Sequence, residues 1–286
     1  MRIKRGLKQG LAETHKIKIG KLGDERTAGS GKKYRLPTKL DHFLVTKTTR
    51  GKEGNFEVDQ AVMDAIGKEP KCIDIMLPFD SVEMNFPTAY QFYIGKQKKC
   101  QGDGETATRY NKDGTSQVVP CDPETCQYAK QDKSPCKVYG RLHCMLSKAL
   151  RLGGVAVLRT HGWHSVSNIL NGLDMIASQT GGILRGIPLR LELLGIETSE
   201  HGVCYVVNVS CVAEDMKELR GQAIHEITER RTLLIDMQQI EQKALAEGVI
   251  EDHDDPAEVA EEFYPDTDLQ AEADIEDIAM GVLDGE

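Results

Sequence analysis

Five of the eight cysteines of this chain fall between Cys100 and Cys144, and this clustering restricts the possible folds more than any other feature. The stretch is 45 residues long, rich in Gly, Asp, Lys, Gln and Pro, and poor in large apolar side chains. A segment of this composition buries too little apolar surface to offset the conformational entropy that it loses on ordering. We therefore expect a further cross-link within it, and a bound metal ion is the simplest one.

The length and the distribution of apolar residues indicate a globular protein of the cytoplasm. At 286 residues the chain can bury a substantial core, as one large domain or two modest ones. It has no run of about 18 apolar residues, and its N-terminal sequence MRIKRGLKQG lacks the apolar core of a signal peptide. Thiols stay reduced in the cytoplasm, so the clustered cysteines are predicted to be metal ligands or catalytic groups rather than disulfides.

Four of these thiols are predicted to form a structural zinc site. Zn²⁺ takes four soft or borderline ligands in a tetrahedron, and thiolates also neutralise its charge. The predicted ligands are Cys100, Cys121, Cys126 and Cys136, with His143 or Cys144 as rivals for the fourth place. Their spacing, C-x20-C-x4-C-x9-C, differs from the C-x2-C pairs of common zinc knuckles, and an iron–sulfur cluster is the alternative. Four protein ligands would leave no bound water to activate, so the expected role is structural.

Charge is distributed unevenly along the chain. Residues 251–286 hold fifteen Asp or Glu and no Lys or Arg, which leaves 30 of the 45 acidic side chains to residues 1–250, against all 36 basic ones. Residues 1–50 hold fourteen Lys or Arg against four Asp or Glu. Such blocks of like charge are typical of solvated surfaces, and also of segments that meet nucleic acid or an oppositely charged protein.

Residues 1–213 are predicted to form a basic α+β body with a mixed, mainly antiparallel sheet, in which the Cys-rich metal-binding insert spans 96–146. Alternating and β-branched residues predict strands, and the apolar stripe of 165–177 predicts a core-facing helix. A shorter helix is expected from Asp59, as its N-cap, to Gly67. The predicted strands are 39–49, 72–77, 155–159, 187–196 and 203–212, of which the last two form an antiparallel hairpin; 141–150 could be strand or helix.

Residues 214–248 are predicted to form one long amphipathic helix, and residues 249–286 an acidic, disordered tail. The helix either packs along its own domain or binds a partner. The apolar residues predicted to contact that partner are Leu219, Ile227, Leu234 and Met237.

Other candidate sites are weaker. His161 and His164 have the spacing of metal ligands without an acidic third ligand nearby, and Asp103 and Glu105 are expected to shape a turn rather than to act as catalytic carboxylates. The sequence contains no P-loop, dinucleotide fingerprint, nucleophile elbow or HExxH motif. Without a catalytic constellation, a protein other than an enzyme is expected.

Four short motifs resemble one known family. They are LPFD at 77–80, EMNFPTAY at 83–90, CQGDGETA at 100–107 and PCDPETC at 120–126. They are similar to the recombination directionality factors of phages and integrative elements that use large serine integrases, a family also catalogued as hydrolase or metal-binding proteins. The resemblance covers roughly residues 15–215, and the long helix and acidic tail have no counterpart in it. It implies an accessory protein that binds the integrase and switches it from integration to excision by redirecting its coiled-coil arms.

Two other functions remain open at this point. The first is a single-stranded DNA-binding protein of phage replication or recombination, although the aromatic content of 5% is low for base stacking. Its nucleic-acid-binding residues would be Lys32, Lys33, Arg35, Tyr90, Phe92 and Tyr93. The second is a metal-dependent hydrolase or nuclease that uses Asp103 or Glu105.

Overall fold

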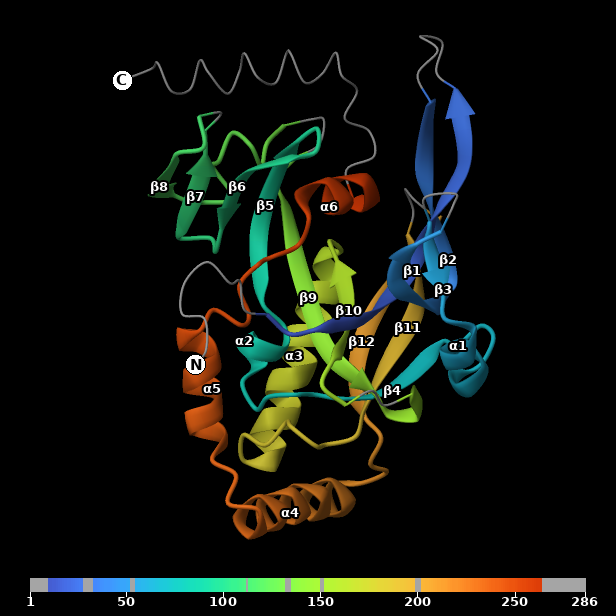
Figure 1. Cartoon of the computed structure of the whole chain (residues 1–286), viewed down its shortest axis with the longest axis vertical. Coiled ribbons are helices and arrows are strands. Elements are labelled where there is room, and N and C mark those ends of the chain that lie inside the picture. The colour runs from blue at the N-terminus through green and yellow to red at the C-terminus, as the bar shows by residue number, and fades with distance from the viewer. Residues whose placement is uncertain are drawn as a thin grey trace, which may run out of the picture. The chain divides into compact units, whose positions relative to one another are not determined.

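The computed structural model has the α+β fold that the sequence predicts, with a mixed and mostly antiparallel sheet (Figure 1). It describes residues 10–27, 33–51, 55–111, 113–131, 135–149, 152–198 and 202–263. The chain divides into two compact units. The first takes its described residues from Met1–Lys21, Lys39–Pro87 and Gly140–His253, and the second from Leu22–Thr38, Thr88–Tyr139 and Asp254–Glu286.

The first unit is built on a sheet in the order β3-β2-β1-β10-β9, in which β1 and β10 run parallel and β10 and β9 antiparallel. Strand β4 pairs with β9 and with β11, and β11 pairs with β12. Strands β1, β2 and β9 contribute residues to both units. The strands are β1 (Glu13–Thr27), β2 (Lys33–Arg50), β3 (Phe56–Val58), β4 (Cys72–Met76), β9 (Lys137–Leu146), β10 (Val155–Thr160), β11 (Leu189–Thr198) and β12 (Gly202–Cys211).

Helix α3 lies against β12, and α2 and α4 contact α3 (Figure 1). The helical elements are α1 (Gln60–Ile66), α2 (Val82–Asn85), the 3-10 turn η1 (Ser147–Ala149), α3 (Trp163–Thr180), α4 (Met216–Thr232) and α5 (Met237–Ala246). In the part of the chain that the structure describes, no helix has the length and apolar character that crossing a bilayer needs.

The second unit contains a meander of four antiparallel strands, β5 to β8, and one short helix. Its elements are β5 (Thr88–Ile94), β6 (Gln97–Gly102), β7 (Thr106–Tyr110), β8 (Ser116–Pro120) and α6 (Pro256–Phe263). Helix α6 occupies the start of the stretch predicted to be disordered, and Val259 and Ala260 are buried against Tyr93 and Tyr139 of the same unit. The acidic residues 264–286 lie outside the described residues.

Several local predictions are confirmed by the cap and burial geometry. The Asp59 carboxylate accepts the N–H of Val62 and starts α1, and Gly67 ends it with φ 114°. The apolar stripe of the 165–177 helix faces the core, and strands β11 and β12 pair antiparallel along their length. The ambiguous stretch 141–150 is mainly strand.

The predicted single helix over 214–248 is wrong, because the chain forms two helices with a break between them. Leu234 lies in the break with φ 54°, a left-handed conformation that a helix interior does not adopt. The Asp236 side chain then accepts the N–H of Gln239 and starts α5. An Asp followed three residues later by Gln is a helix-start signal, so the break was readable in the sequence.

A buried ion-pair network attaches these C-terminal helices to the body of the first unit. The Asp80 carboxylate accepts the backbone N–H groups of Leu184 and Arg185, each at 3.0 Å. It also accepts two hydrogen bonds from the Arg230 guanidinium of α4. The Arg230 Nε also donates to Glu226 of the same helix at 2.9 Å, so the guanidinium lies between two carboxylates. Asp80 therefore joins three separate segments of the first unit.

Helix α5 is attached to the same loop. One oxygen of Glu241 accepts the backbone N–H groups of Asp80 and Ser81, at 2.6 and 3.1 Å. Because these N–H groups precede α2, the glutamate also lies where the helix dipole favours an anion.

We expect the Arg230→Ala substitution to lower the free energy of unfolding by about 3 kcal/mol, because it breaks a largely desolvated ion pair and removes the arginine that pairs with Asp80. Arg231→Ala is the matched control, since Arg231 is exposed, and it should change stability by less than about 0.5 kcal/mol. Urea unfolding followed by circular dichroism measures both. Equal losses in the two variants would contradict the structural role of the network.

Candidate functional site

The four cysteines predicted as ligands come from three places in the second unit. Cys100 lies in β6, where it pairs with Phe92 of β5 on one side and Arg109 of β7 on the other. Its side chain is buried. Cys121 directly follows β8, and its N–H donates to the Glu105 carbonyl at 2.9 Å, so the meander continues into the loop that carries the remaining thiols.

The loop after β8 is shaped by its own hydrogen bonds. The Asp122 carboxylate accepts the Glu124 N–H at 2.9 Å and the Thr125 hydroxyl at 2.7 Å. The Cys126 N–H donates to the Asp122 carbonyl at 2.8 Å, which closes one tight turn between the second and third thiols. Aspartate favours such turns because its side chain replaces a backbone acceptor.

A backbone hydrogen bond helps to place the fourth thiol, that of Cys136, beside the other three. The Cys136 N–H donates to the Tyr128 carbonyl at 2.8 Å. The Tyr128 ring stacks on Phe92 of β5, with ring centroids 4.4 Å apart. The Arg109 guanidinium lies over the same tyrosine ring, 4.9 Å from its centroid. This tyrosine therefore connects the loop of Cys136 to the strands that carry Cys100.

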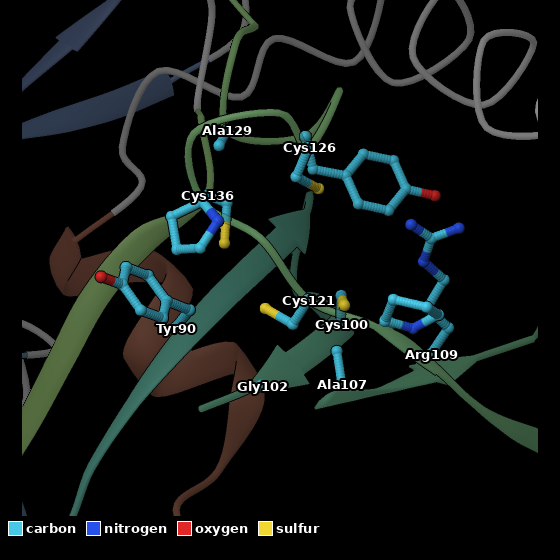
Figure 2. A pocket seen from close by; sticks show the side chains of 12 residues that line it. Tyr90, Cys100, Gly102, Ala107, Arg109, Cys121, Cys126, Ala129 and Cys136 are labelled. Carbon is cyan, nitrogen blue, oxygen red and sulfur yellow. The ribbon is translucent and has the colours of Figure 1, made fainter. Parts of the chain in front are cut away.

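All four cysteines line one small cavity in the second unit, and Figure 2 shows their side chains around it. The cavity measures about 20 Å³, which is space for about one water-sized particle. Gly102 of β6 borders the cavity too. A Cβ atom on this glycine would stand 2.8 Å from the Cys121 sulfur, so the absence of a side chain lets the sulfur approach the strand.

Burial and proximity make the thiolate forms of Cys136 and Cys100 unfavourable. Burial, and then repulsion from the Cys100, Cys126 and Cys121 thiolates, together raise the pKa of the Cys136 thiol to about 12. Burial likewise raises the pKa of Cys100, which Arg109 opposes. A cation in the cavity would oppose both of these shifts, because it stabilises the thiolate forms of Cys136 and Cys100.

The donor set fits zinc in kind and number, whereas the distances are not those of a formed coordination shell. Within the described residues, no group of three or more His, Cys, Asp or Glu side chains is arranged as a metal site. Zinc–sulfur bonds are about 2.3 Å long, so the four side chains would have to close further on an ion. As they stand, the thiols pack as part of an apolar cluster with Phe92, Ile94, Ala107 and Tyr128.

The rivals for the fourth ligand lie in the first unit and do not line this cavity. Both belong to β9 and are buried there. The Cys144 thiol donates to the Ala156 carbonyl at 3.6 Å, and His143 Nδ1 lies 3.4 Å from the Met84 carbonyl. Their surroundings are those of core residues, which leaves Cys136 as the fourth thiol at the cavity.

Asp103 has the loop-shaping role that the sequence predicts. Its carboxylate accepts the backbone N–H groups of Glu105 and Thr106, each at 2.8 Å. The bonds from Thr106 and then Glu105 lower the pKa of Asp103. Hydrolase chemistry at this carboxylate would have to break the turn that it stabilises.

The residues assigned to single-stranded DNA are not presented as a stacking surface. Phe92 and Tyr93 are buried in the core, with 0% and 1% of their surface exposed. Tyr90 borders the cysteine cavity. Of the basic residues, Lys32 and the side chains of Lys33 and Arg35 lie outside the described residues. Base stacking on Phe92 and Tyr93 is therefore excluded in this conformation, because stacking needs an accessible ring face.

Sequence reasoning missed the strands within the Cys-rich insert. The sequences TATRY at 106–110 and SQVVP at 116–120 form β7 and β8. Asp113 and Gly114 lie in the turn between them, and a Gly with φ 83° fits such a turn. This Asp-Gly pair between two short β-prone runs was the available signal for a hairpin.

In a comparison with known protein families, one family model matches the chain. A family model described as Gp3-like, recombination directionality factor-like, matches residues 15–212. The matched span contains the whole cysteine cavity and ends before α4. No curated protein and no solved structure matches the chain.

We expect Gly102→Ala to lower the unfolding temperature and to open the cysteine cavity, because the added methyl group would meet the Cys121 sulfur and the Thr106 carbonyl, the latter at 2.7 Å. Overpacking of this kind costs about 1–3 kcal/mol. Gly221→Ala is the matched control, since a Cβ at that helical glycine meets nothing within 4 Å. Differential scanning calorimetry compares the two. A Gly102 variant as stable as the Gly221 variant would show that the sulfur is not held against β6.

Proposed function

The chain belongs to the Gp3-like family of recombination directionality factor-like proteins, and from this premise we propose that it binds a serine integrase and switches that enzyme from integration toward excision. The family match over residues 15–212 is the observation that carries the proposal. The resemblance of its motifs to directionality factors of large serine integrases supports this choice of partner. In this proposal the chain acts by contact, and the integrase supplies the catalytic residues.

The proposed contact surface for the integrase lies at the break between α4 and α5. A cavity of about 400 Å³ is lined there by Ile227, Arg230, Arg231, Leu234, Ile235 and Asp236. The Leu234 side chain is 91% exposed. A bulky residue with positive φ costs of order 1–3 kcal/mol, and such conformations cluster at functional sites. An exposed leucine on strained backbone, beside a groove that also presents the exposed Arg231, suits an amphipathic helix of the partner that carries an acidic residue.

The structure narrows the set of residues predicted to contact the partner. Leu219 and Met237 are buried, so they hold α4 and α5 to their own unit. Ile227 and Leu234 line the groove and are the two that remain available to a partner. Because the family match ends at residue 212, this surface is supported by exposure and backbone geometry and is independent of the match.

A small energetic preference is sufficient for the proposed switch. Binding one arrangement of the coiled-coil arms of the integrase more tightly than another shifts their populations by the difference in binding free energy. Each 1.4 kcal/mol changes the ratio about tenfold, so a few contacts at an apolar groove can reverse the favoured outcome.

We also propose that the cavity lined by Cys100, Cys121, Cys126 and Cys136 holds a structural Zn²⁺ ion. Four thiols around an ion-sized space support this proposal, and so do the raised pKa values of Cys136 and Cys100, which a cation would oppose. Zinc would supply the cation that lets the thiolates form together and would cross-link β6 to the loop after β8.

We expect the purified chain to contain about one zinc per molecule, and Cys121→Ser or Cys136→Ser to lose it and to unfold at a lower temperature. Cys72→Ser is the matched control, because Cys72 is exposed and belongs to the first unit. Elemental analysis and thermal unfolding with and without a chelator provide the measurements. Metal-free protein that a chelator leaves equally stable would show that the four thiols are an apolar cluster only.

We expect Leu234→Asp to weaken binding to the serine integrase encoded beside this gene at least about tenfold, because a carboxylate replaces the most exposed apolar contact of the groove. Leu152→Asp makes the same change at a leucine that is 88% exposed in a turn remote in sequence. Biolayer interferometry measures binding, and an excision assay on a plasmid carrying both hybrid attachment sites measures the switch.

Two outcomes would count against the proposal. Undiminished binding by the Leu234 variant would remove the groove as the contact surface while leaving the integrase as the partner. Failure of the unsubstituted chain to bind the integrase or to promote excision would contradict the proposed function itself.

A further inference from the structure

Strand β8 forms the outer edge of the meander in the second unit (Figure 1). It pairs with β7 on one side, and the strand order ends there, so no other described strand lies along its second side. We call this second side the open edge. Ser116 and Pro120 are exposed, and Val118 has 76% of its surface exposed. Neither the family match nor the proposed integrase contact gives this edge a role.

Two hydrogen bonds at the ends of the β7–β8 pair show which backbone groups face the open edge. They run from the Cys121 N–H to the Glu105 carbonyl and from the Asn111 N–H to the Thr115 carbonyl, each at 2.9 Å. Both bonds join odd-numbered residues, and hydrogen-bonded pairs recur at every second residue of an antiparallel ladder. The even-numbered residues of β8 therefore direct their backbone groups away from β7. These residues are Ser116, Val118 and Pro120.

Two other edge strands are protected in ways that β8 is not. Strand β12 packs against α3, and the Ser165 hydroxyl oxygen of that helix accepts the backbone N–H of Val207 at 3.1 Å. Strand β3 is three residues long and carries the charged Glu57. Strand β8 has the sequence SQVVP, which contains no charged side chain. A covering element, short length and charge are the protections that keep edge strands from pairing between chains, so β8 is open to such pairing.

We propose that β8 pairs with the β8 strand of a second copy of this chain, antiparallel and around a two-fold axis at Val118. In this register the Val118 residues of the two copies lie opposite each other and exchange their N–H···O=C bonds. The Ser116 N–H of each copy then donates to the Pro120 carbonyl of the other copy. Every N–H that faces the open edge is thereby bonded, because a proline has no N–H to leave unpaired.

The side chains of β8 also suit an identical strand. Val118 meets a second β-branched side chain directly opposite, so both copies bury apolar surface that each exposes alone. Because β8 carries no charged side chain, the pairing sets no like charges against each other within the strand. The nearest carboxylates in the sequence, Asp113 and Asp122, lie beyond the ends of β8 and are exposed to screening by salt. Pairing uses the open edge of both copies, so assembly ends at a dimer.

The experiment is sedimentation velocity of the full-length chain between about 1 and 100 µM, because an interface of one strand per copy is small and dissociates on dilution. The unsubstituted chain should shift from monomer toward dimer over this range. Val118→Lys should raise the dissociation constant of the dimer at least about tenfold, because it places two like charges directly opposite each other. Val118→Ile keeps the β-branched contact and should keep the dimer.

Two further substitutions separate backbone pairing from contact between side chains. Val118→Pro removes the N–H that faces the open edge and spares the bonds to β7, so it should abolish the dimer with an unchanged circular dichroism spectrum. Val203→Lys is the matched control, because it makes the same change as Val118→Lys at a valine of the first unit that is 47% exposed. It should leave the dissociation constant unchanged.

Hydrogen exchange followed by mass spectrometry locates the interface. In a peptic peptide that contains β8, about two more amides per chain should be protected in the dimer than in the monomer. These are the amides of Ser116 and Val118, which face the open edge. Val118→Pro should show no such gain of protection on concentration.

Three results would overturn the proposal. They are a chain that stays monomeric over the whole range, a dimer that Val118→Lys or Val118→Pro leaves intact, and a dimer that forms without slower exchange in β8. Protection of β8 in a monomeric chain only after the integrase is added would assign the edge to a strand of that partner and overturn it as well. The measurements on the chain alone do not involve the integrase, so their outcome is separate from tests of the proposed function.

Discussion

The second unit depends on four thiols, one buried and three half-buried, that line a space of about 20 Å³. Burial raises the pKa of Cys136 and of Cys100, so their thiolates would be stabilised by a cation in that space. In the neutral state they pack with Phe92 and Tyr128 as small apolar side chains. The same arrangement thus serves as a minimal core and, under the proposed role, as a preformed set of zinc ligands. Both roles require that the loop of Cys126 and Cys136 lies against β6.

In the first unit, the main structural feature is the attachment of α4 and α5, which lie C-terminal to the family-matched residues. Asp80 and Glu241 join α4 and α5 to the loop before α2 through charged hydrogen bonds. Because these anchors and the buried Leu219 and Met237 fix the helices, Leu234 can be left exposed at the break between them. A groove that these contacts hold in place is what a protein needs if it acts by binding one conformation of its partner.

The parts of the fold that could be predicted are those in which residues close in sequence determine the structure, such as helix caps and hairpin turns. Helix α1 begins at Asp59 and ends at Gly67 because a carboxylate cap and a positive-φ glycine act within one turn. The hairpin β11–β12 followed from two apolar runs around one turn. The apolar spacing continues through the helix break at Leu234 and therefore predicts one helix, whereas the cap at Asp236 is the local signal of the break. The polar composition of the insert predicts that it cannot order itself. The hairpin turn at Gly114 is the local signal that it contains strands.

The sequence by itself determined the family, through motifs at fixed positions, and it named the four cysteines that line the cavity, because few other thiols are close in the chain. Only the tertiary structure decided that Cys136, and neither His143 nor Cys144, joins the other three, and that Phe92 and Tyr93 are core residues. It alone placed β8 at the outer edge of the meander. The physical reason is that strand pairing and burial join residues far apart in the chain, and local spacing carries no record of those partners.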